Sequence, residues 1–161
     1  MVTADLSRDP DPEKQPALVR VDVYQEWRQK EGVPLVGGIY LRDMNEVEVG
    51  PWPRKGDGVK GALCYMDGYD ESEEHIVELS EGSSTAPLKH MYTEAIYVLS
   101  GRGSTTVWQE EGAKQTFEWG PGSLFAIPLN AWYQHFNASG TEPARYLAVT
   151  TAPVALRTYN D

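Results

Sequence analysis

The sequence predicts an all-β domain of the barrel or sandwich type, with a short helix and loop extension before it. Two observations predict this class. From residue 61 onward, short runs rich in β-branched and aromatic residues alternate with turn signals. The 161 residues also include 15 Gly and 11 Pro, a content that favours a turn-rich β protein over a helical bundle.

The first 60 residues are expected to form an arm, a helix and a loop. Residues 1–16 are rich in Pro and Asp, which predicts a flexible acidic arm. Asp22 is a favourable N-cap for a short helix, and Gly32 is a favourable residue for its end. The segment 17–60 is therefore predicted to be a helix and loop extension to the barrel.

The barrel itself is predicted over residues 61–161. Its eight candidate strands are GALCYM, HIVEL, AIYVLSG, STTVWQ, TFEW, LFAIP, WYQHFN and RYLAVTT. The acidic stretch 67–74 between the first two runs is expected to be a solvated connection. His75, which follows this stretch, is expected to be exposed.

The charge of the chain excludes several functions. The formal net charge is −10, with 24 acidic against 14 basic residues. A nucleic-acid-binding protein needs a cationic face, and so does a protein that binds anionic membranes. We therefore expect a small-molecule substrate as the partner, with no nucleic acid and no membrane.

Cysteine usage and targeting signals narrow the class further. Cys64 is the single cysteine, so neither an intrachain disulfide nor a cysteine-based zinc site is expected, and its strand-like surroundings favour a buried packing thiol. The N-terminus lacks the pattern of a signal peptide, and no apolar run is long enough to span a bilayer. The expected compartment is the cytoplasm.

Two strand-like segments carry the residues that suit chemistry. Because side chains on a strand alternate between faces, His90, Tyr92 and Glu94 are predicted to share one face, and Tyr133 and His135 another. If these faces meet inside a barrel, two imidazoles, one carboxylate and two phenols converge. Imidazole and carboxylate together suit Fe, Mn, Ni or Zn.

The spacing of these residues resembles that of a known family. Gly82-x5-Leu88-x-His90-x3-Glu94-x6-Gly101 is similar to the first cupin motif, G-x5-H-x-H-x3-4-E-x6-G. Gly122-x5-Pro128-x-Asn130-x2-Tyr133-x3-Asn137 is similar to the second, G-x5-P-x-G-x2-H-x3-N. This resemblance covers residues 61–151. It implies a cupin-like double-stranded β-helix, also called a jelly-roll barrel.

The resemblance also implies a metal, with departures at two positions. In cupins of this pattern the two histidines and the glutamate of the first motif, with the histidine of the second, bind a metal. Here Leu88 and Tyr133 occupy two of these four positions. His90 and Glu94 remain as the implied ligands of a divalent metal, with Fe(II) the favoured ion. His135 would complete a set that resembles the facial triad of non-haem iron enzymes.

Three functions stay open at this point. In the first, His90, Glu94 and His135 hold a metal in a dioxygenase-like cupin enzyme. In the second, a metal-free lyase, dehydratase, cyclase or isomerase uses Glu94 or His90 as general base, with Tyr133 or Tyr92 as general acid. The second function requires burial to raise the pKa of Glu94. In the third, the barrel is a non-catalytic module that binds a small ligand.

The predicted substrate cavity is small, apolar and aromatic. Leu88, Trp132, Phe125 and Ile127 are the residues expected to line it. The exposed edge strands of such a barrel favour a homodimer that pairs through sheet edges, as the cupin resemblance also implies.

Overall fold

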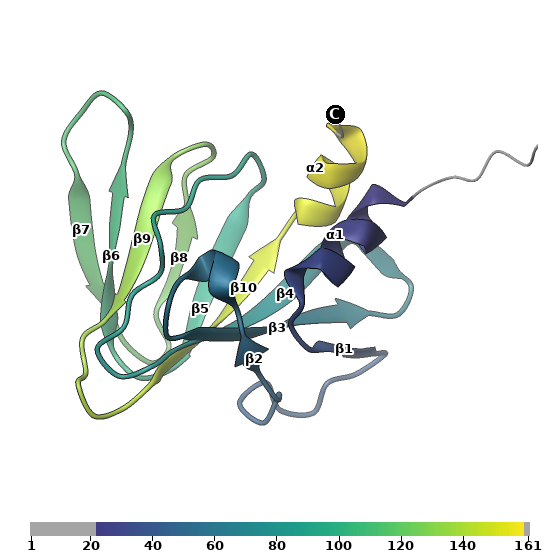
Figure 1. Cartoon of the computed structure of the whole chain (residues 1–161), viewed down its shortest axis with the longest axis horizontal. Coiled ribbons are helices and arrows are strands. Elements are labelled where there is room, and N and C mark those ends of the chain that lie inside the picture. The colour runs from purple at the N-terminus through teal and green to yellow at the C-terminus, as the bar shows by residue number, and fades with distance from the viewer. Residues whose placement is uncertain (1–21, 160–161) are drawn as a thin grey trace, which may run out of the picture.

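The computed structural model describes residues 22–159 and consists of two facing β-sheets with a helix near each end of this range (Figure 1). The predicted arm, 1–16, lies outside the described residues. The elements in chain order are α1 (Val23–Glu31), β1 (Leu35–Gly38), β2 (Gly50–Pro51), the 3₁₀ helix η1 (Pro53–Lys55), β3 (Val59–Met66), β4 (Tyr69–Leu79), β5 (Glu94–Ser100), β6 (Gly103–Trp108), β7 (Gln115–Trp119), β8 (Leu124–Ile127), β9 (Trp132–Asn137), β10 (Ala144–Thr150) and α2 (Ala152–Thr158).

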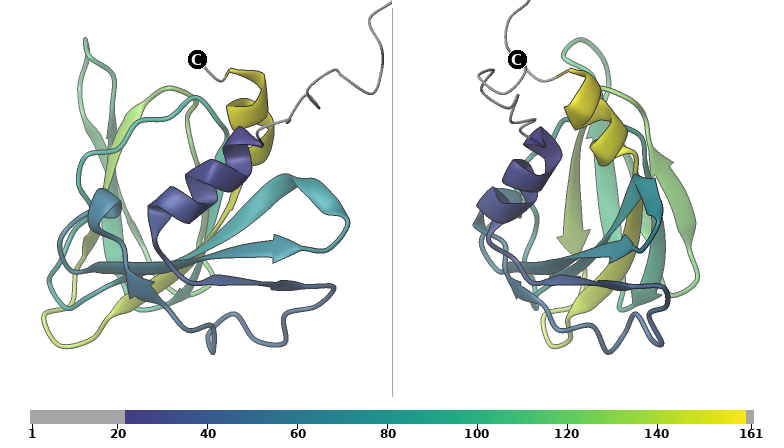
Figure 2. Two further views of the ribbon diagram at one scale, coloured as in Figure 1. Left: turned by 45° about the vertical axis from the view of Figure 1, so that its right-hand side comes forward. Right: turned by 90° about the vertical axis from the view of Figure 1, so that its right-hand side faces the viewer.

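The two sheets form the barrel that the sequence predicts. Sheet A has the order β1-β3-β4-β10-β5-β8, with β2 paired to β3, and sheet B has the order β7-β6-β9. Isolated bridges from Ser84 to Phe136 and from Leu88 to Tyr133 add residues 84–88 to the edge of sheet B. Figure 2 shows the two sheets curving toward each other, with α1 and α2 side by side at the upper end of the barrel. The predicted all-β fold is confirmed.

The two helices have different sequence signals. The Asp22 carboxylate accepts hydrogen bonds from the backbone N–H groups of Tyr24 and Gln25, and Gly32 ends α1 with a φ of 67°, as predicted. The helix α2 was not predicted, because it spans seven residues and Thr151 makes no side-chain cap. No helix between residues 22 and 159 is both long and apolar enough to cross a bilayer.

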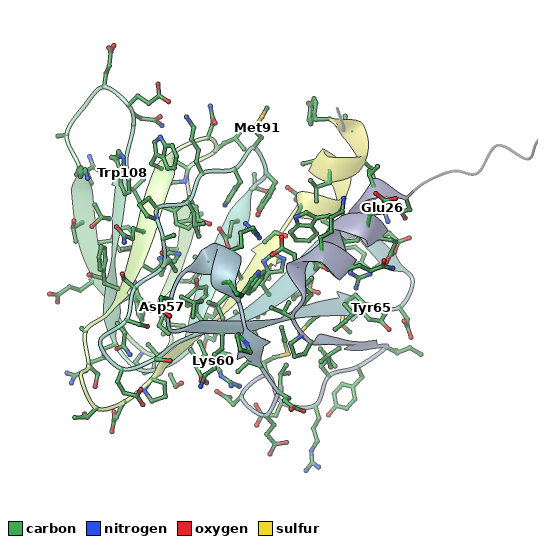
Figure 3. All side chains as sticks on the ribbon, in the orientation of Figure 1. Glu26, Asp57, Lys60, Tyr65, Met91 and Trp108 are labelled. Carbon is green, nitrogen blue, oxygen red and sulfur yellow. The ribbon has the colours of Figure 1, made fainter. Side chains whose placement is uncertain are left out.

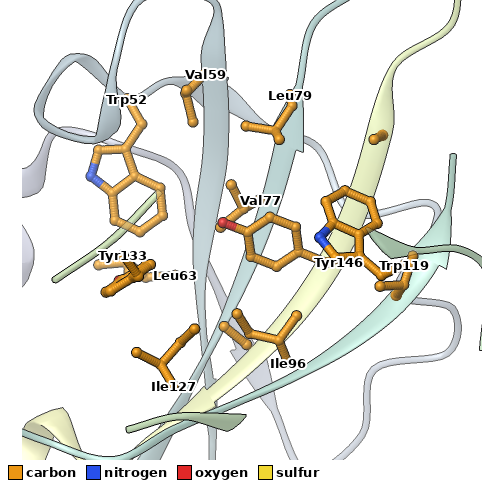
Figure 4. Packing of buried hydrophobic residues seen from close by; sticks show 13 residues of the cluster. Trp52, Val59, Leu63, Val77, Leu79, Ile96, Trp119, Ile127, Tyr133 and Tyr146 are labelled. Atoms are coloured by element: carbon orange, nitrogen blue, oxygen red, sulfur yellow. The ribbon is translucent and has the colours of Figure 1, made fainter. Parts of the chain in front are cut away.

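The main core fills the space between the sheets (Figure 4). Its largest fully buried aromatic side chains are Trp52, Tyr133 and Tyr146. A second, smaller core lies on the outer face of sheet A, where the chain before β2 packs onto the buried residues Ala62, Cys64 and Ile76. Burial raises the pKa of the Cys64 thiol to about 12, as expected for a packing cysteine.

The expected solvated connection over 67–74 is confirmed only in part, since residues 67–71 are exposed but Glu73 is buried, and the expected exposure of His75 is wrong. The strand β4 begins at Tyr69, and the side chains of Glu73 and His75 are fully buried. Arg28 from α1 places its Nε 2.9 Å from Glu73 Oε1, and His75 Nε2 lies 3.1 Å from Glu73 Oε2. The acidic residue can be buried because the helix supplies a positive partner from far away in the sequence.

Candidate functional site

Glu94, the first residue of β5, is the centre of a buried hydrogen-bonded group. His90 Nε2 lies 2.8 Å from Glu94 Oε2, and the Tyr133 hydroxyl donates to the same oxygen at 2.9 Å. Burial and the Glu94 carboxylate raise the pKa of Tyr133 well above its usual value, so that its proton stays in place to donate. Leu88 fixes the position of Tyr133, because the backbones of the two residues exchange two hydrogen bonds of 2.9 Å.

Both ring nitrogens of His90 lie beside atoms that can accept a hydrogen bond. His90 Nδ1 lies 2.8 Å from the backbone oxygen of Tyr92, which can only accept a hydrogen bond. Since Nε2 faces the Glu94 carboxylate, the two contacts fix the orientation of the ring from both sides. The Tyr92 ring stacks on the imidazole with ring centroids 3.9 Å apart.

Glu94 is ionised although it is buried. Burial by itself raises the pKa of this carboxyl, but the Lys55 ammonium and the hydrogen bond from His90 outweigh burial and hold the pKa well below its usual value. The expectation that Glu94 has a raised pKa is therefore wrong, although burial acts in that direction. The main opposing cause is the neighbouring Lys55, a lysine whose own pKa is lowered by burial and to which no local sequence pattern points.

Lys55 points into the barrel from η1. Its side chain is almost fully buried, and its Nζ lies 4.6 Å from the centroid of the Trp52 ring. Gly56 permits this course of the chain, because a Cβ there would lie 2.8 Å from the backbone nitrogen of Ala86. A lysine in a Pro- and Gly-rich loop resembles an ordinary surface residue, so the sequence offered no signal for it.

His135 lies beyond Tyr133 and has different partners. Its Nδ1 is 2.7 Å from Thr105 Oγ1, and that hydroxyl also accepts a hydrogen bond of 2.9 Å from Trp119 Nε1. The rings of Tyr133 and His135 have centroids 5.1 Å apart. Burial lowers the pKa of His135 to about 4, so the ring is neutral at pH 7.

The predicted metal ligands do not fit a metal ion in this arrangement. His90 Nε2 and Glu94 Oε2, the atoms that would bind a metal, face each other. His135 is hydrogen-bonded to Thr105. Within residues 22–159, no three His, Cys, Asp or Glu side chains are grouped so that they could hold a metal ion. The arrangement instead suits proton transfer, because one carboxylate holds an imidazole and a phenol in fixed positions.

His90 and Tyr92 line a pocket of about 490 Å³ that lies between α1, α2 and the loop 90–92. Met91 marks this loop at the rim of the barrel in Figure 3. The walls of the pocket are largely apolar and aromatic, with Trp27 from α1 and Tyr159 after α2, and the pocket also includes charged residues of α1. It can accept a small organic molecule beside the His90 ring.

The four residues predicted to line a substrate cavity lie elsewhere. Ile127 belongs to the main core, and Leu88 and Phe125 pack against it. Trp132 stacks on Trp108 with ring centroids 6.3 Å apart. None of the four is among the residues that line the pocket beside His90.

The barrel matches the model of a known protein family. Residues 75–150 match the family model described as "Cupin domain". The chain carries a cupin domain. The cupin domain of Cnp3 from Schizosaccharomyces pombe superimposes with a TM-score of 0.57 at 17% identity, covering 73% of this chain and 78% of that one. Oxalate decarboxylase from Lactobacillus farciminis gives 0.55 at 21% identity, covering 68% of this chain and 32% of that one. These two likenesses show the fold alone.

One curated protein is similar to the cupin chain in sequence. A 5-aminosalicylate 1,2-dioxygenase from Comamonas sp is 34% identical over 71 residues, which are 44% of this chain and 17% of that enzyme. The match thus spans about a sixth of the length of the curated relative.

The low pKa of His135 predicts a pH dependence of stability. Below its ordinary pKa of about 6.5, the unfolded chain binds a proton that the folded chain does not bind until near pH 4. This residue should therefore lower the free energy of unfolding by about 2 kcal/mol between pH 7 and pH 5. Urea unfolding at the two pH values measures the difference. His135→Gln should reduce that pH dependence, and an equal dependence in both proteins would contradict the assignment.

Proposed function

We propose that this cupin chain is an enzyme that acts on a small organic molecule by acid–base chemistry, with His90 exchanging a proton with the substrate. The reaction class is that of a lyase, dehydratase, cyclase or isomerase. The observation that supports the proposal is the group in which His90 and Tyr133 both bind one oxygen of Glu94 beside the pocket.

Each residue of the group has a distinct role in the proposed reaction. His90 lines the pocket and is the proton donor or acceptor through Nδ1, which would exchange its hydrogen bond to the Tyr92 backbone oxygen for one to the substrate. Glu94 stabilises the imidazolium, and Tyr133 fixes the carboxylate that does so. Tyr92 stacks on the imidazole and lines the same pocket. A positioned proton donor of this kind contributes about 10²–10⁴-fold to a rate.

The pocket favours a substrate with an apolar or aromatic body and one polar group. Trp27, Leu156 and Tyr159 supply the surface for the body. The polar group of the substrate would face His90. This residue lines the pocket and also contacts the buried Glu94 carboxylate. Lys30 and Glu26 also line the pocket and lie 3.9 Å apart as an ion pair, so these two charges balance each other there.

The test is exchange of carbon-bound hydrogen in D₂O, followed by ¹H NMR over a panel of small keto acids and phenols. For any molecule that the protein exchanges, His90→Gln should lower the rate by about 10²–10⁴-fold, and Tyr133→Phe should lower it less. Arg42→Gln, a change in the loop before β2, is the control and should leave the rate unchanged. Equal rates in wild type and His90→Gln would overturn the proposal.

The partial likeness to the 5-aminosalicylate 1,2-dioxygenase favours a second candidate, a metal-dependent, dioxygenase-like enzyme. Elemental analysis after reconstitution with Fe(II), Mn(II), Ni(II) and Zn(II) distinguishes the two. One equivalent of bound metal, together with oxygen uptake, would favour this second candidate. A non-catalytic module would instead show a higher melting temperature with small acids and no turnover.

A further inference from the structure

The helix α1 ends in a carboxylate that binds the segment carrying Lys55. Glu31 is the last residue of α1, and its side chain is only 4% exposed. Its oxygens Oε1 and Oε2 lie 2.7 and 2.8 Å from Arg54 Nε, and Oε2 also accepts a hydrogen bond from the Trp52 indole N–H. Trp52 directly precedes η1, and Arg54 belongs to it. One side chain of the helix therefore fastens η1 to α1.

The two cations of η1, Arg54 and Lys55, both contact the Trp52 ring but differ in exposure. The Arg54 side chain is 46% exposed, and its Cζ lies 5.8 Å from the centroid of Trp52 and 5.9 Å from that of Trp27 in α1. Lys55 is 2% exposed, and its Nζ lies 4.6 Å from the centroid of the fully buried Trp52 ring. Because Glu31 binds the N–H group of this indole, it also fixes the surface against which the Lys55 ammonium packs.

The Lys55 ammonium needs such a hold, because a buried charge is costly. Burial lowers the pKa of Lys55, the neighbouring Arg54 acts in the same direction, and the carboxylates of Glu94 and Glu31 oppose them. Glu31 is bonded to Arg54 and so offsets the positive charge adjacent to Lys55. Without Glu31, the repulsion from Arg54 would no longer be offset, and the buried Trp52 N–H would lose its acceptor.

We propose that Glu31 is a positioning residue that holds Lys55 inside the barrel, a role that rests on the proposed function of the Glu94 group. Glu31 acts through its contacts with Trp52 and Arg54. The Lys55 ammonium then keeps Glu94 charged, and Glu94 in turn holds His90 at the pocket. The helix α1, which also lines that pocket, would thus serve both the binding of the substrate and the charge of the group.

Trace acetylation of the full chain with acetic anhydride, followed for each lysine by mass spectrometry, tests the position of Lys55 without a substrate. In the wild type Lys55 should react about 100-fold more slowly than the exposed Lys114, because a buried amine reacts only when the structure opens locally. Glu31→Gln should raise the Lys55 rate by about 10-fold, the effect of losing one hydrogen bond to a charged group, and should leave the Lys114 rate unchanged. Equal Lys55 rates in the two proteins would overturn the proposal.

Glu78→Gln is the matched control, because the Glu78 side chain is also mostly buried, at 15% exposed, and also binds a guanidinium, that of Arg145. This variant should leave the Lys55 rate as in the wild type, and a rise equal to that of Glu31→Gln would contradict a specific role of Glu31. Circular dichroism checks the fold of each variant. If Glu31→Gln does not fold, Glu31→Asp takes its place with the same expectation, since the shorter side chain moves the oxygens away from η1.

The effect on the proposed reaction is measured separately. For any molecule that the protein exchanges, Glu31→Gln and Lys55→Met should each lower the rate, and the double variant should lower it no further than Lys55→Met alone. Additive losses would mean that Glu31 acts independently of Lys55, which would overturn the positioning role. Equal rates in wild type and His90→Gln would instead overturn the proposed function alone, because the acetylation rates of Lys55 do not depend on a substrate.

Discussion

Replacing Arg28 by methionine is expected to lower the free energy of unfolding by about 3–5 kcal/mol. The side chains of Arg28 and Glu73 are 7% and 0% exposed, and they form an ion pair of 2.9 Å. The guanidinium also lies over the rings of Tyr24 and Tyr65, at 5.2 and 4.7 Å from their centroids. Without it, Glu73 is a buried carboxylate whose remaining side-chain partners are neutral at pH 7, since burial lowers the pKa of His75.

Urea unfolding at pH 7 measures the effect. Lys30→Met, an exposed change on the same helix, is the control and should shift stability by less than about 0.5 kcal/mol. Arg28→Met combined with Glu73→Gln should recover part of the loss, because no unpaired charge is then buried. If the single variant is as stable as Lys30→Met, the pair does not hold α1 on the barrel.

Glu94→Gln is expected to lower the rate of the proposed reaction by about 10²–10⁴-fold. The amide keeps the shape of the side chain but removes the negative charge that faces His90 Nε2 and Lys55. His90 Nε2 should then lie beside an uncharged amide, and its ¹⁵N signal should shift. The ¹⁵N spectrum of histidine-labelled protein shows this change directly, without any knowledge of the substrate.

Glu118→Gln removes one negative charge from an exposed position of β7 and controls for net charge. It should leave both the His90 signals and the rate as in the wild type. An unchanged ¹⁵N signal of His90 in the Glu94→Gln protein would mean that the carboxylate does not contact the imidazole, and the proposed role of Glu94 would be wrong.

The spacing of residues along the chain predicted the part of the site that the two strands β5 and β9 contribute. The alternation of side chains placed Glu94 and Tyr133 on inward faces, and the structure brings the two together with His90. The glycine, proline and asparagine positions of the two cupin motifs could also be recognised from the sequence, because neighbouring residues determine the turns between strands.

The remaining parts of the site depend on residues that are distant in sequence. Lys55 is turned inward by the packing of η1 against residues 84–86, which no local pattern shows. Glu73 and His75 are buried because Arg28 crosses from a helix that precedes the barrel. The pocket beside His90 is built by α1 and α2, and the second of these helices carries no strong sequence signal.

The position of β10 determines when this barrel can fold. It is the last strand of the described chain, yet it lies between β4 and β5 and pairs with both. During synthesis, β4 and β5 leave the ribosome well before the strand that joins them. The strands β4 and β5 therefore lack the strand that lies between them until residue 150 has left the ribosome. Folding of this domain should take milliseconds to seconds, as is typical of barrels rich in non-local pairings.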